Sequence, residues 1–473
     1  MKIQQIYTGC LAQGAYYIES EGEVAIIDPL REVQPYIDMA SRNNAKIKYI
    51  FETHFHADFV SGHLTLADKT GAKIIYGPTA KPTFEAHVAA DGEEFRLGKV
   101  TFKLLHTPGH TMESSTFLLK DESGKDHAIF SGDTLFLGDV GRPDLAQKAA
   151  NMTQEELAGL LYDSLRNKIM TLVDDVIVYP AHGQGSACGK NMMTETIDTL
   201  GHQKKVNYAL RADMTRDEFI KEVTEGLLPP PAYFPMNVKM NKEGYESIDT
   251  IISQGKRALD PVAFELEAET HEALILDVRD KDDFRKGFIP RSIFIGLDDD
   301  FAPWVGALIK DVYTPILLVT PEGREEEAVT RLARVGFDNT LGYLKGGIAA
   351  WEAAGKEIDR VDSMSAEALA EKILRSGKDL LIYDVRRASE YNEDHLKIAA
   401  NTPLDFLNDH LAEFPKKTPF FLHCKGGYRS MIASSILKSR GYHNLIDVMG
   451  GFEAIKESKI EAPVFATSEK TNS

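Results

Sequence analysis

Histidine and aspartate side chains gather directly after a buried strand in the first part of this chain, and they constrain its fold more than any other feature. The largely apolar run 47–51 predicts the strand, and the segment Thr53–His63 follows it. Within that segment, positions 54–58 hold two histidines and an aspartate. Ligands bind at such strand ends in open α/β sheets, and imidazole and carboxylate groups at this density are typical of a metal site.

Three later turns repeat the arrangement, each with one candidate ligand just past a predicted strand and beside a glycine or proline that favours a tight turn. The ligands are His110, Asp133 and His182. Four turns of this kind can converge on one edge of a sheet sandwich. We therefore expect one buried metal centre, with strands and helices alternating around it as far as residue 245.

The order H-x-H-x-D, then H, then D, then H resembles that of the metallo-β-lactamase superfamily. The resemblance covers the whole first segment and implies an αβ/βα sandwich. Phe59 departs from it, because the dinuclear hydrolases of the superfamily have a histidine there. A phenyl ring cannot bind a metal, so a second metal position would keep Asp58 and His182 but lose one nitrogen ligand.

A single ion held by His54, His110 and Asp133 is the simpler arrangement. Two histidines and a carboxylate form the facial set associated with non-heme Fe(II), which leaves positions open for dioxygen and substrate. Spacing does not separate iron from zinc. Within the superfamily, however, the segment looks most like the persulfide dioxygenases, and this resemblance implies one non-heme Fe(II) per chain. His56, Asp58 and His182 are then expected to support the ligands or line the pocket.

The loop Gly141–Asp144 also matches a loop that persulfide dioxygenases place near the iron. Arg142 is expected either to pair with Asp144 or to offer its guanidinium to an anionic substrate, with a solvated surface arginine as the alternative. Cys188 follows His182 in a glycine-rich run, where it is expected to lie near the pocket and carry sulfur or to be a small buried side chain. Cys10 is treated in the same way.

The rest of the chain contains an internal repeat. Segment 276–279 is echoed by 383–386, 315–320 by 419–424, and 344–347 by 448–451. Each copy alternates strands and helices, which predicts a small α/β domain with a parallel sheet. The predicted domains are 1–245, 246–360 and 361–473, and the proline-rich stretch 227–241 is predicted to lack regular structure.

In the second copy, a predicted strand leads into Cys424, the loop that follows it and a helix. Glycines let backbone N–H groups turn toward the sulfur, and the helix N-terminus adds positive potential, so the thiolate is favoured. The pattern C-x-x-G-x-R-S resembles the active loop of rhodanese sulfurtransferases. Phosphatase loops differ, because five residues separate their cysteine and arginine, whereas four do here. The resemblance implies catalytic roles for Cys424 and Arg429, with the persulfide cradled by Lys425, Gly426, Gly427 and Tyr428.

The first copy lacks this chemistry. Thr320 stands where the second copy has its cysteine, and Glu325–Glu327 follow at the start of a helix. Three carboxylates there suit the helix dipole but repel an anionic substrate. We expect this copy to be structural, either a spacer between domains or a surface for oligomerisation.

Composition excludes several classes of function. The chain has 54 basic and 72 acidic residues, a net charge of −18, so binding to nucleic acid or to an anionic membrane is not expected. Its 3 cysteines lie far apart and make no disulfide framework. It shows neither a signal-peptide pattern nor an apolar run long enough for a membrane helix. We predict a cytoplasmic homo-oligomer, either a dimer or a tetramer.

The two resemblances together match bacterial fusions of a persulfide dioxygenase with a sulfurtransferase, which act in sulfide detoxification. They imply oxidation of a small thiol persulfide, such as that of glutathione or coenzyme A, by dioxygen to sulfite. Sulfur transfer through a Cys424 persulfide would then make or use thiosulfate. The alternatives are a thioester hydrolase of the glyoxalase II type, which needs a metal pair, and a non-catalytic sulfide sensor or scaffold.

Overall fold

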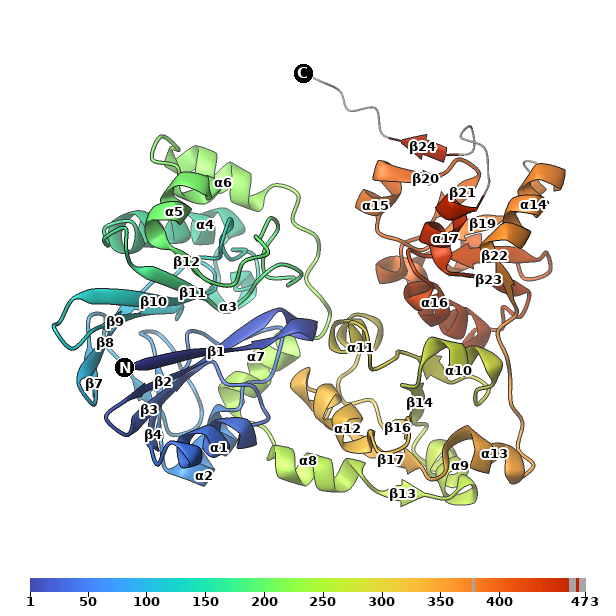
Figure 1. The fold of residues 1–473 in the computed structure, drawn as a ribbon, viewed down its shortest axis with the longest axis horizontal. Helices are drawn as coiled ribbons and strands as arrows, with labels where there is room; N and C mark the ends of the chain where they lie inside the picture. The colour runs from blue at the N-terminus through green and yellow to red at the C-terminus, as the bar shows by residue number, and fades with distance from the viewer. Residues whose placement is uncertain (377–378, 459–464, 468–473) are drawn as a thin grey trace. The chain divides into compact units, whose positions relative to one another are not determined.

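The computed structural model describes residues 1–473 except 377–378, 459–464 and 468–473 (Figure 1). The described chain divides into two compact units. The first consists of residues 1–250 with 310–312 and 332–337, and the second consists of 251–309, 313–331 and the described residues from 338 onward. Among the described residues, no helix is both long enough and apolar enough to cross a membrane.

The first unit contains two six-stranded sheets. One has the order β1 (Lys2–Thr8), β2 (Gln13–Ser20), β3 (Glu23–Ile27), β4 (Lys46–Phe51), β5 (Lys73–Tyr76) and β6 (His87–Val88). The other has the order β12 (Asp198–Thr199), β11 (Ile177–Pro180), β10 (Asp126–Gly132), β9 (Ser115–Lys120), β8 (Val100–His106) and β7 (Glu94–Leu97). Each sheet mixes antiparallel and parallel pairs, as β1 with β2 and β3 with β4 illustrate.

The two sheets pack face to face around an aromatic core. Phe51 of β4 packs against Phe102 of β8 and Phe117 of β9 in tilted arrangements, with ring centroids 5.0 and 4.5 Å apart. Helices cover both outer faces, because Tyr36 of α1 belongs to an apolar cluster on the first sheet and Phe219 of α6 to one on the second. The helices of this unit are α1 (Gln34–Arg42), α2 (His63–Thr70), α3 (Gln147–Ala150), α4 (Gln154–Ser164), α5 (Leu200–Val206), α6 (Arg216–Thr224) and α7 (Phe234–Glu243). The predicted αβ/βα sandwich is confirmed.

One local prediction is wrong. The stretch 227–241 was expected to lack regular structure, yet α7 begins at Phe234 and has a proline in its first turn. Proline is favoured at that position, because its fixed φ suits the helix and the missing N–H would have no partner there. The preceding prolines, at 229–231, lie in the part of the stretch that does lack regular structure.

The second unit contains two five-stranded sheets in which every strand pair is parallel. The first has the order β13 (Ala258–Leu259), β17 (Thr340–Leu344), β16 (Ile316–Val319), β14 (Leu274–Asp277) and β15 (Ile293–Phe294). The second has the order β18 (Ser363–Ser365), β23 (Leu445–Met449), β22 (Phe420–His423), β19 (Ile382–Asp384) and β21 (Ala399–Asn401). The two orders correspond strand by strand, as the internal repeat predicts.

Helices flank both of these sheets, and one short strand pair lies outside them. β20 (Asp394–Leu396) pairs with β24 (Phe465–Thr467). The first repeat contains α9 (Pro261–Thr270), α10 (Lys281–Lys286), α11 (Phe301–Leu308), α12 (Glu325–Arg334) and α13 (Gly347–Ala353), and α8 (Ile248–Gly255) precedes it. The second contains α14 (Ala366–Ser376), α15 (Ala388–Glu393), α16 (Tyr428–Ser439) and α17 (Gly451–Glu457).

A glycine at the end of the histidine-rich loop permits close packing of two backbone segments. The N–H of Gly62 donates to the carbonyl of Pro29 at 2.8 Å. A Cβ on Gly62 would lie 2.1 Å from the carbonyl oxygen of Leu30 and 2.8 Å from Val33 Cγ1. Any side chain would therefore push the loop away from the segment that supports it.

We expect Gly62→Ala to lower the free energy of unfolding by about 1–3 kcal/mol, because the added methyl group overpacks this contact. Denaturant unfolding followed by circular dichroism measures the change. Gly9→Ala is the matched control, since no atom lies within 4 Å of the Cβ it would add. Equal stability of the two variants would contradict the close-packing argument.

Candidate metal centre and sulfur-transfer loop

Three buried side chains from different strand ends converge in the first unit. His54 follows β4, His110 follows β8 and Asp133 follows β10, and one ligand atom of each lies within 4.8 Å of the others. Asp133 Oδ2 is 3.4 Å from His110 Nε2 and 3.8 Å from His54 Nε2. This oxygen is buried and accepts no hydrogen bond among the described residues. Two nitrogens and a carboxylate oxygen without a partner fit a metal ion.

Hydrogen bonds fix the orientation of each ligand. His110 Nδ1 donates to the carbonyl of Arg142 at 2.8 Å, so Nε2 is left with its lone pair toward the centre. His54 Nδ1 lies 3.0 Å from Thr53 Oγ1, and that hydroxyl donates to Asp28 Oδ2 at 2.8 Å. Both rings are therefore held through Nδ1, as imidazole ligands commonly are.

Electrostatics favour the protonation states that bind a metal. Burial, together with the neighbouring His56, holds the pKa of His54 well below its ordinary value, so this ring is neutral. Burial alone would raise the pKa of Asp133, but His182 and His54 outweigh it and lower that pKa below its ordinary value. A neutral imidazole and an ionised carboxylate thus face each other in a dry site.

His56 belongs to a different group, with Asp28 and Glu52. Its Nε2 lies 3.1 Å from Asp28 Oδ1 and 3.6 Å from Glu52 Oε2. The ring of Phe59 packs on the His56 ring, with centroids 4.4 Å apart and planes at 34°. Burial and then Asp28 raise the pKa of Glu52, and Ser61 Oγ donates to its carboxylate at 2.5 Å. His56 thus lies close to two carboxylates that are not part of the triad of His54, His110 and Asp133.

Asp58, His182 and Cys188 form a third buried group. His182 Nδ1 lies 2.8 Å from Asp133 Oδ1, and its Nε2 lies 2.8 Å from Asp58 Oδ2. Burial alone would lower the pKa of His182, but Asp133 and Asp58 raise it well above its ordinary value. The Nδ1 atom of His182 is hydrogen-bonded to Asp133, whereas its Nε2, although close to Asp58, has no hydrogen-bond partner among the described residues.

Cys188 and Arg142 connect this group to the rest of the pocket. Burial, then Asp133 and Asp58, raise the pKa of the Cys188 thiol, so it is protonated. The Arg142 guanidinium donates to both oxygens of Asp144 at 2.7 Å, and the Arg142 backbone N–H donates to the carbonyl of Cys188 at 3.0 Å. Arg142 is 6% exposed, so the surface alternative is wrong. Cys10 is in none of the three groups found among the described residues.

The second candidate centre lies at the start of α16. Gly427, at a φ of +101°, directs its N–H to Cys424 Sγ at 3.1 Å, and the helix begins at the next residue. Arg429 donates through both terminal nitrogens to Glu390 at 2.6 and 2.8 Å. Burial lowers the pKa of Arg429, but Glu390 and Cys424 outweigh it and raise that pKa.

The rest of the predicted cradle contributes little charge at the sulfur. Lys425 is exposed and lies 3.6 Å from Glu453, and Tyr428 donates its hydroxyl to the carbonyl of Gly296 at 3.0 Å. The backbone N–H and the helix N-terminus therefore act most directly on Cys424, which is 1% exposed. In the first repeat Thr320 is buried at the corresponding position, so no thiol is present.

Comparison with known proteins identifies the families of both parts of the chain. The metallo-beta-lactamase superfamily model matches residues 8–182, and the rhodanese-like domain model matches residues 261–354 and 365–458. The crystal structure of a metallo-beta-lactamase from Staphylococcus aureus subsp. aureus COL is 30% identical, with a TM-score of 0.63. The match covers 73% of this chain and 98% of that one. The chain belongs to the metallo-β-lactamase superfamily. Two rhodanese-like domains follow its catalytic fold.

Curated relatives within the superfamily match the first segment. The mitochondrial persulfide dioxygenase ETHE1 of Homo sapiens is 28% identical over 46% of this chain and 78% of its own length. The hydroxyacylglutathione hydrolase of Francisella philomiragia subsp. philomiragia is 31% identical over 35% of this chain and 61% of its own length. Sequence identity alone therefore does not choose between an oxygenase and a hydrolase.

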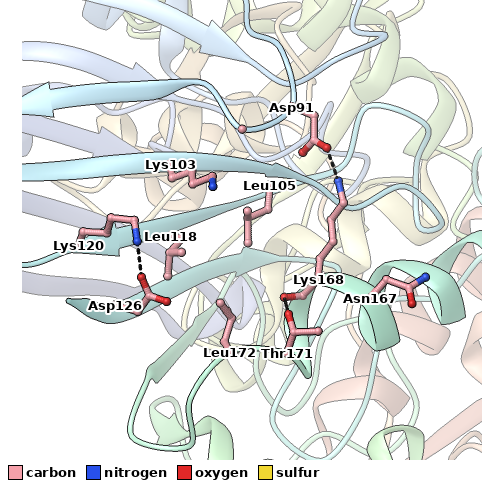
Figure 2. A pocket seen from close by; sticks show the side chains of 11 residues that line it. Asp91, Lys103, Leu105, Leu118, Lys120, Asp126, Asn167, Lys168, Thr171 and Leu172 are labelled. Carbon is pink, nitrogen blue, oxygen red and sulfur yellow. Dashed lines mark hydrogen bonds and ion pairs between the residues drawn. The ribbon is translucent and has the colours of Figure 1, made fainter. Parts of the chain in front are cut away.

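A separate cavity of about 330 Å³ lies against β8, β9 and β10 (Figure 2). Two of its three lysines pair with its two aspartates, with Lys120 2.5 Å from Asp126 and Lys168 2.7 Å from Asp91. None of the residues that line it is a candidate ligand. The buried strand-end group is therefore the candidate site, and this surface hollow is not.

Sequence reasoning missed the support behind the ligands. Asp28 follows β3 and Glu52 follows β4, so both are acidic residues at the end of a buried strand. That signal is the one that identified Asp133, and it would have found them too. Glu390, which holds Arg429, gives no such signal, because it lies within α15.

We expect His110→Ala to reduce the bound metal by about tenfold or more, because the variant removes a ligand nitrogen from a buried three-ligand group. Elemental analysis of the purified protein measures this. His202→Ala is the matched control, since His202 is exposed and pairs only with Asp198. Full metal content in His110→Ala would show that the triad does not hold the ion.

Proposed function

We propose that the chain is a persulfide dioxygenase fused to a sulfurtransferase, with one Fe(II) held by His54, His110 and Asp133. The observation that carries this proposal is the buried triad, in which Asp133 Oδ2 faces Nε2 of both His54 and His110 and accepts no hydrogen bond among the described residues. Phe59 follows Asp58 in the same loop and offers no ligand atom to a second ion. A hydrolytic metal pair would therefore lack one nitrogen ligand.

The bound iron would supply the redox chemistry that joins dioxygen to sulfur. Overall, RSSH + O₂ + H₂O gives RSH, sulfite and two protons, so the outer sulfur is oxidised and dioxygen reduced. The Arg142 carbonyl accepts a hydrogen bond from His110 and so fixes the orientation of that ring. The ion pair between the Arg142 guanidinium and Asp144 stabilises the loop to which this carbonyl belongs. The His182 imidazolium, which bridges Asp133 and Asp58, is a proton source near the developing sulfite charge.

Cys424 would carry sulfur between the products of this reaction. Its thiolate attacks the outer sulfur of a persulfide or of thiosulfate, the old S–S bond breaks, and RS⁻ or sulfite leaves. The resulting Cys424 persulfide passes that sulfur to sulfite or to a thiol by the reverse step. The Gly427 N–H, 3.1 Å from Sγ, stabilises the anion in either direction.

A glyoxalase II type hydrolase is the second candidate. It is favoured by the identity to hydroxyacylglutathione hydrolase and by the group of Asp58, His182 and Cys188, whose atoms lie within 4.8 Å of one another. A second ion there would have to displace the His182 proton and ionise the Cys188 thiol.

We expect the Fe(II)-loaded protein to consume one dioxygen per sulfite formed from glutathione persulfide or coenzyme A persulfide. An oxygen electrode combined with sulfite analysis measures both quantities. His110→Ala should reduce uptake to the background rate, while His202→Ala should keep it. Two metal ions per chain with turnover of an acylated glutathione, and no oxygen uptake, would favour the hydrolase instead.

We expect Cys424→Ser to abolish thiosulfate formation from persulfide and sulfite while oxygen uptake persists, because serine cannot carry the sulfur. Chromatographic separation of sulfite and thiosulfate distinguishes the two products. Cys10→Ser is the control, since Cys10 lies outside the three ligand groups. Unchanged thiosulfate formation in Cys424→Ser would remove Cys424 from the proposed function.

A further inference from the structure

The helix that begins at the Cys424 loop packs against the cysteine-less repeat. Residues 430–438 of α16 are all buried, and the helix lies against β15 and α10 of that repeat (Figure 1). Ser435 Oγ accepts from the N–H of Phe294 at 3.0 Å, and the Tyr428 hydroxyl donates to the carbonyl of Gly296 at 3.0 Å. The first repeat therefore forms one wall around the start of the sulfur-transfer helix.

A buried ion pair extends this contact to the loop. Arg285 of α10 lies 3.1 Å from Asp447 Oδ2, and Ser430 Oγ donates to Asp447 Oδ1 at 2.7 Å. Asp447 is fully buried, so without Arg285 its carboxylate would lose its counter-charge. Ser430 Oγ also lies 3.2 Å from the carbonyl of Gly427. The first repeat thus reaches the residue whose N–H points at the sulfur.

Lys281, also of α10, lies beside that residue. Its Cε is 3.8 Å from the position a Cβ on Gly427 would take. The side chain is partly buried, and among the described residues it makes neither a hydrogen bond nor an ion pair within 4 Å. In contrast, Lys425 and Arg429 pair with Glu453 and Glu390. Lys281 is therefore the cation of this loop region whose charge is not committed to a carboxylate.

Carboxylates lie within electrostatic range of Lys281, but among the described residues none forms an ion pair with it. Burial raises the pKa of Asp299, and the charge of Lys281 lowers it in part, which places the two groups within electrostatic range. Asp298 is paired with Arg324 at 2.7 Å, and Asp300 belongs to the same acidic turn. This turn also raises the pKa of Tyr428, after burial. An anion that reaches the loop would be repelled by the turn unless Lys281 met it.

We propose that Lys281 of the cysteine-less repeat binds the anionic group of the sulfur donor at the Cys424 loop. The inference rests on the proposed function of Cys424 as the sulfur carrier. With thiosulfate, the Cys424 thiolate attacks the outer sulfur, the S–S bond breaks, and sulfite leaves with the bonding electron pair. Lys281 faces the sulfonate that becomes this sulfite. The repeat that lacks a cysteine is then half of a composite site, and not only a spacer.

Steady-state transfer from thiosulfate to cyanide tests the proposal in the full-length protein. Lys281→Met keeps the methylene chain over Gly427 but removes the charge. It should lower kcat/KM for thiosulfate about fivefold at low ionic strength, the size expected for a partly exposed ion pair. Lys281→Arg should stay within about twofold of wild type. Because kcat/KM for cyanide reports attack of the cyanide anion on the Cys424 persulfide, after the sulfonate has left as sulfite, it should change less than kcat/KM for thiosulfate.

Salt and a second lysine provide the controls. Added salt should lower kcat/KM for thiosulfate more in wild type than in Lys281→Met, because screening acts on a charge the variant lacks. Lys286→Ala, on the same helix but paired with Asp283 and exposed, should match wild type. Wild-type kcat/KM for thiosulfate in Lys281→Met would overturn the proposal. Thiocyanate formation that survives in Cys424→Ser would instead overturn the assignment of Cys424.

Discussion

The carboxylate of Asp133 is the group on which the first unit depends. One oxygen faces the Nε2 atoms of His54 and His110, and the other accepts from His182. Asp133 is 1% exposed, and burial alone would raise its pKa, but His182 and the two other imidazoles outweigh burial and lower it. The loops at the ends of β4, β8, β10 and β11 meet at this carboxylate.

The loops that carry the candidate ligands approach one another closely, and glycines make these approaches possible. A Cβ on Gly132 would lie 2.7 Å from the Thr53 side chain, and one on Gly141 would lie 1.9 Å from the carbonyl oxygen of Asp133. Both positions flank ligand loops, so larger residues would separate the ligands. The two glycines therefore permit the close backbone contacts that bring the candidate ligands together, although their own atoms would not bind the ion.

Motif reasoning could predict the candidate ligands and set His56 apart from them, but it could not name the side chains that surround His56. The strand-end pattern predicted His54, His110 and Asp133 together, and the spacing after Cys424 predicted the N–H cradle. It could not assign His56, because its place depends on Asp28 and Glu52, which come from neighbouring strand ends. The role of Arg142 also needed the structure, since its guanidinium satisfies carbonyls of Ala187 and Leu228, far away in sequence. The parallel sheets were predictable because each repeat alternates strand and helix signals.

Phe59 affects the buried charges around the candidate metal centre of the first unit. In this unit buried histidines lie next to buried carboxylates, so Phe59 matters for these contacts as well as for the number of metal ligands. Its ring packs on that of His56, which lies 3.1 Å from Asp28. Asp58 and Asp133 each lie 2.8 Å from one nitrogen of His182, and these carboxylates raise the pKa of that ring. Because Phe59 offers no ligand atom beside Asp58, the loop supplies fewer nitrogen ligands than a pair of ions needs, and the triad of His54, His110 and Asp133 is the complete ligand group that remains.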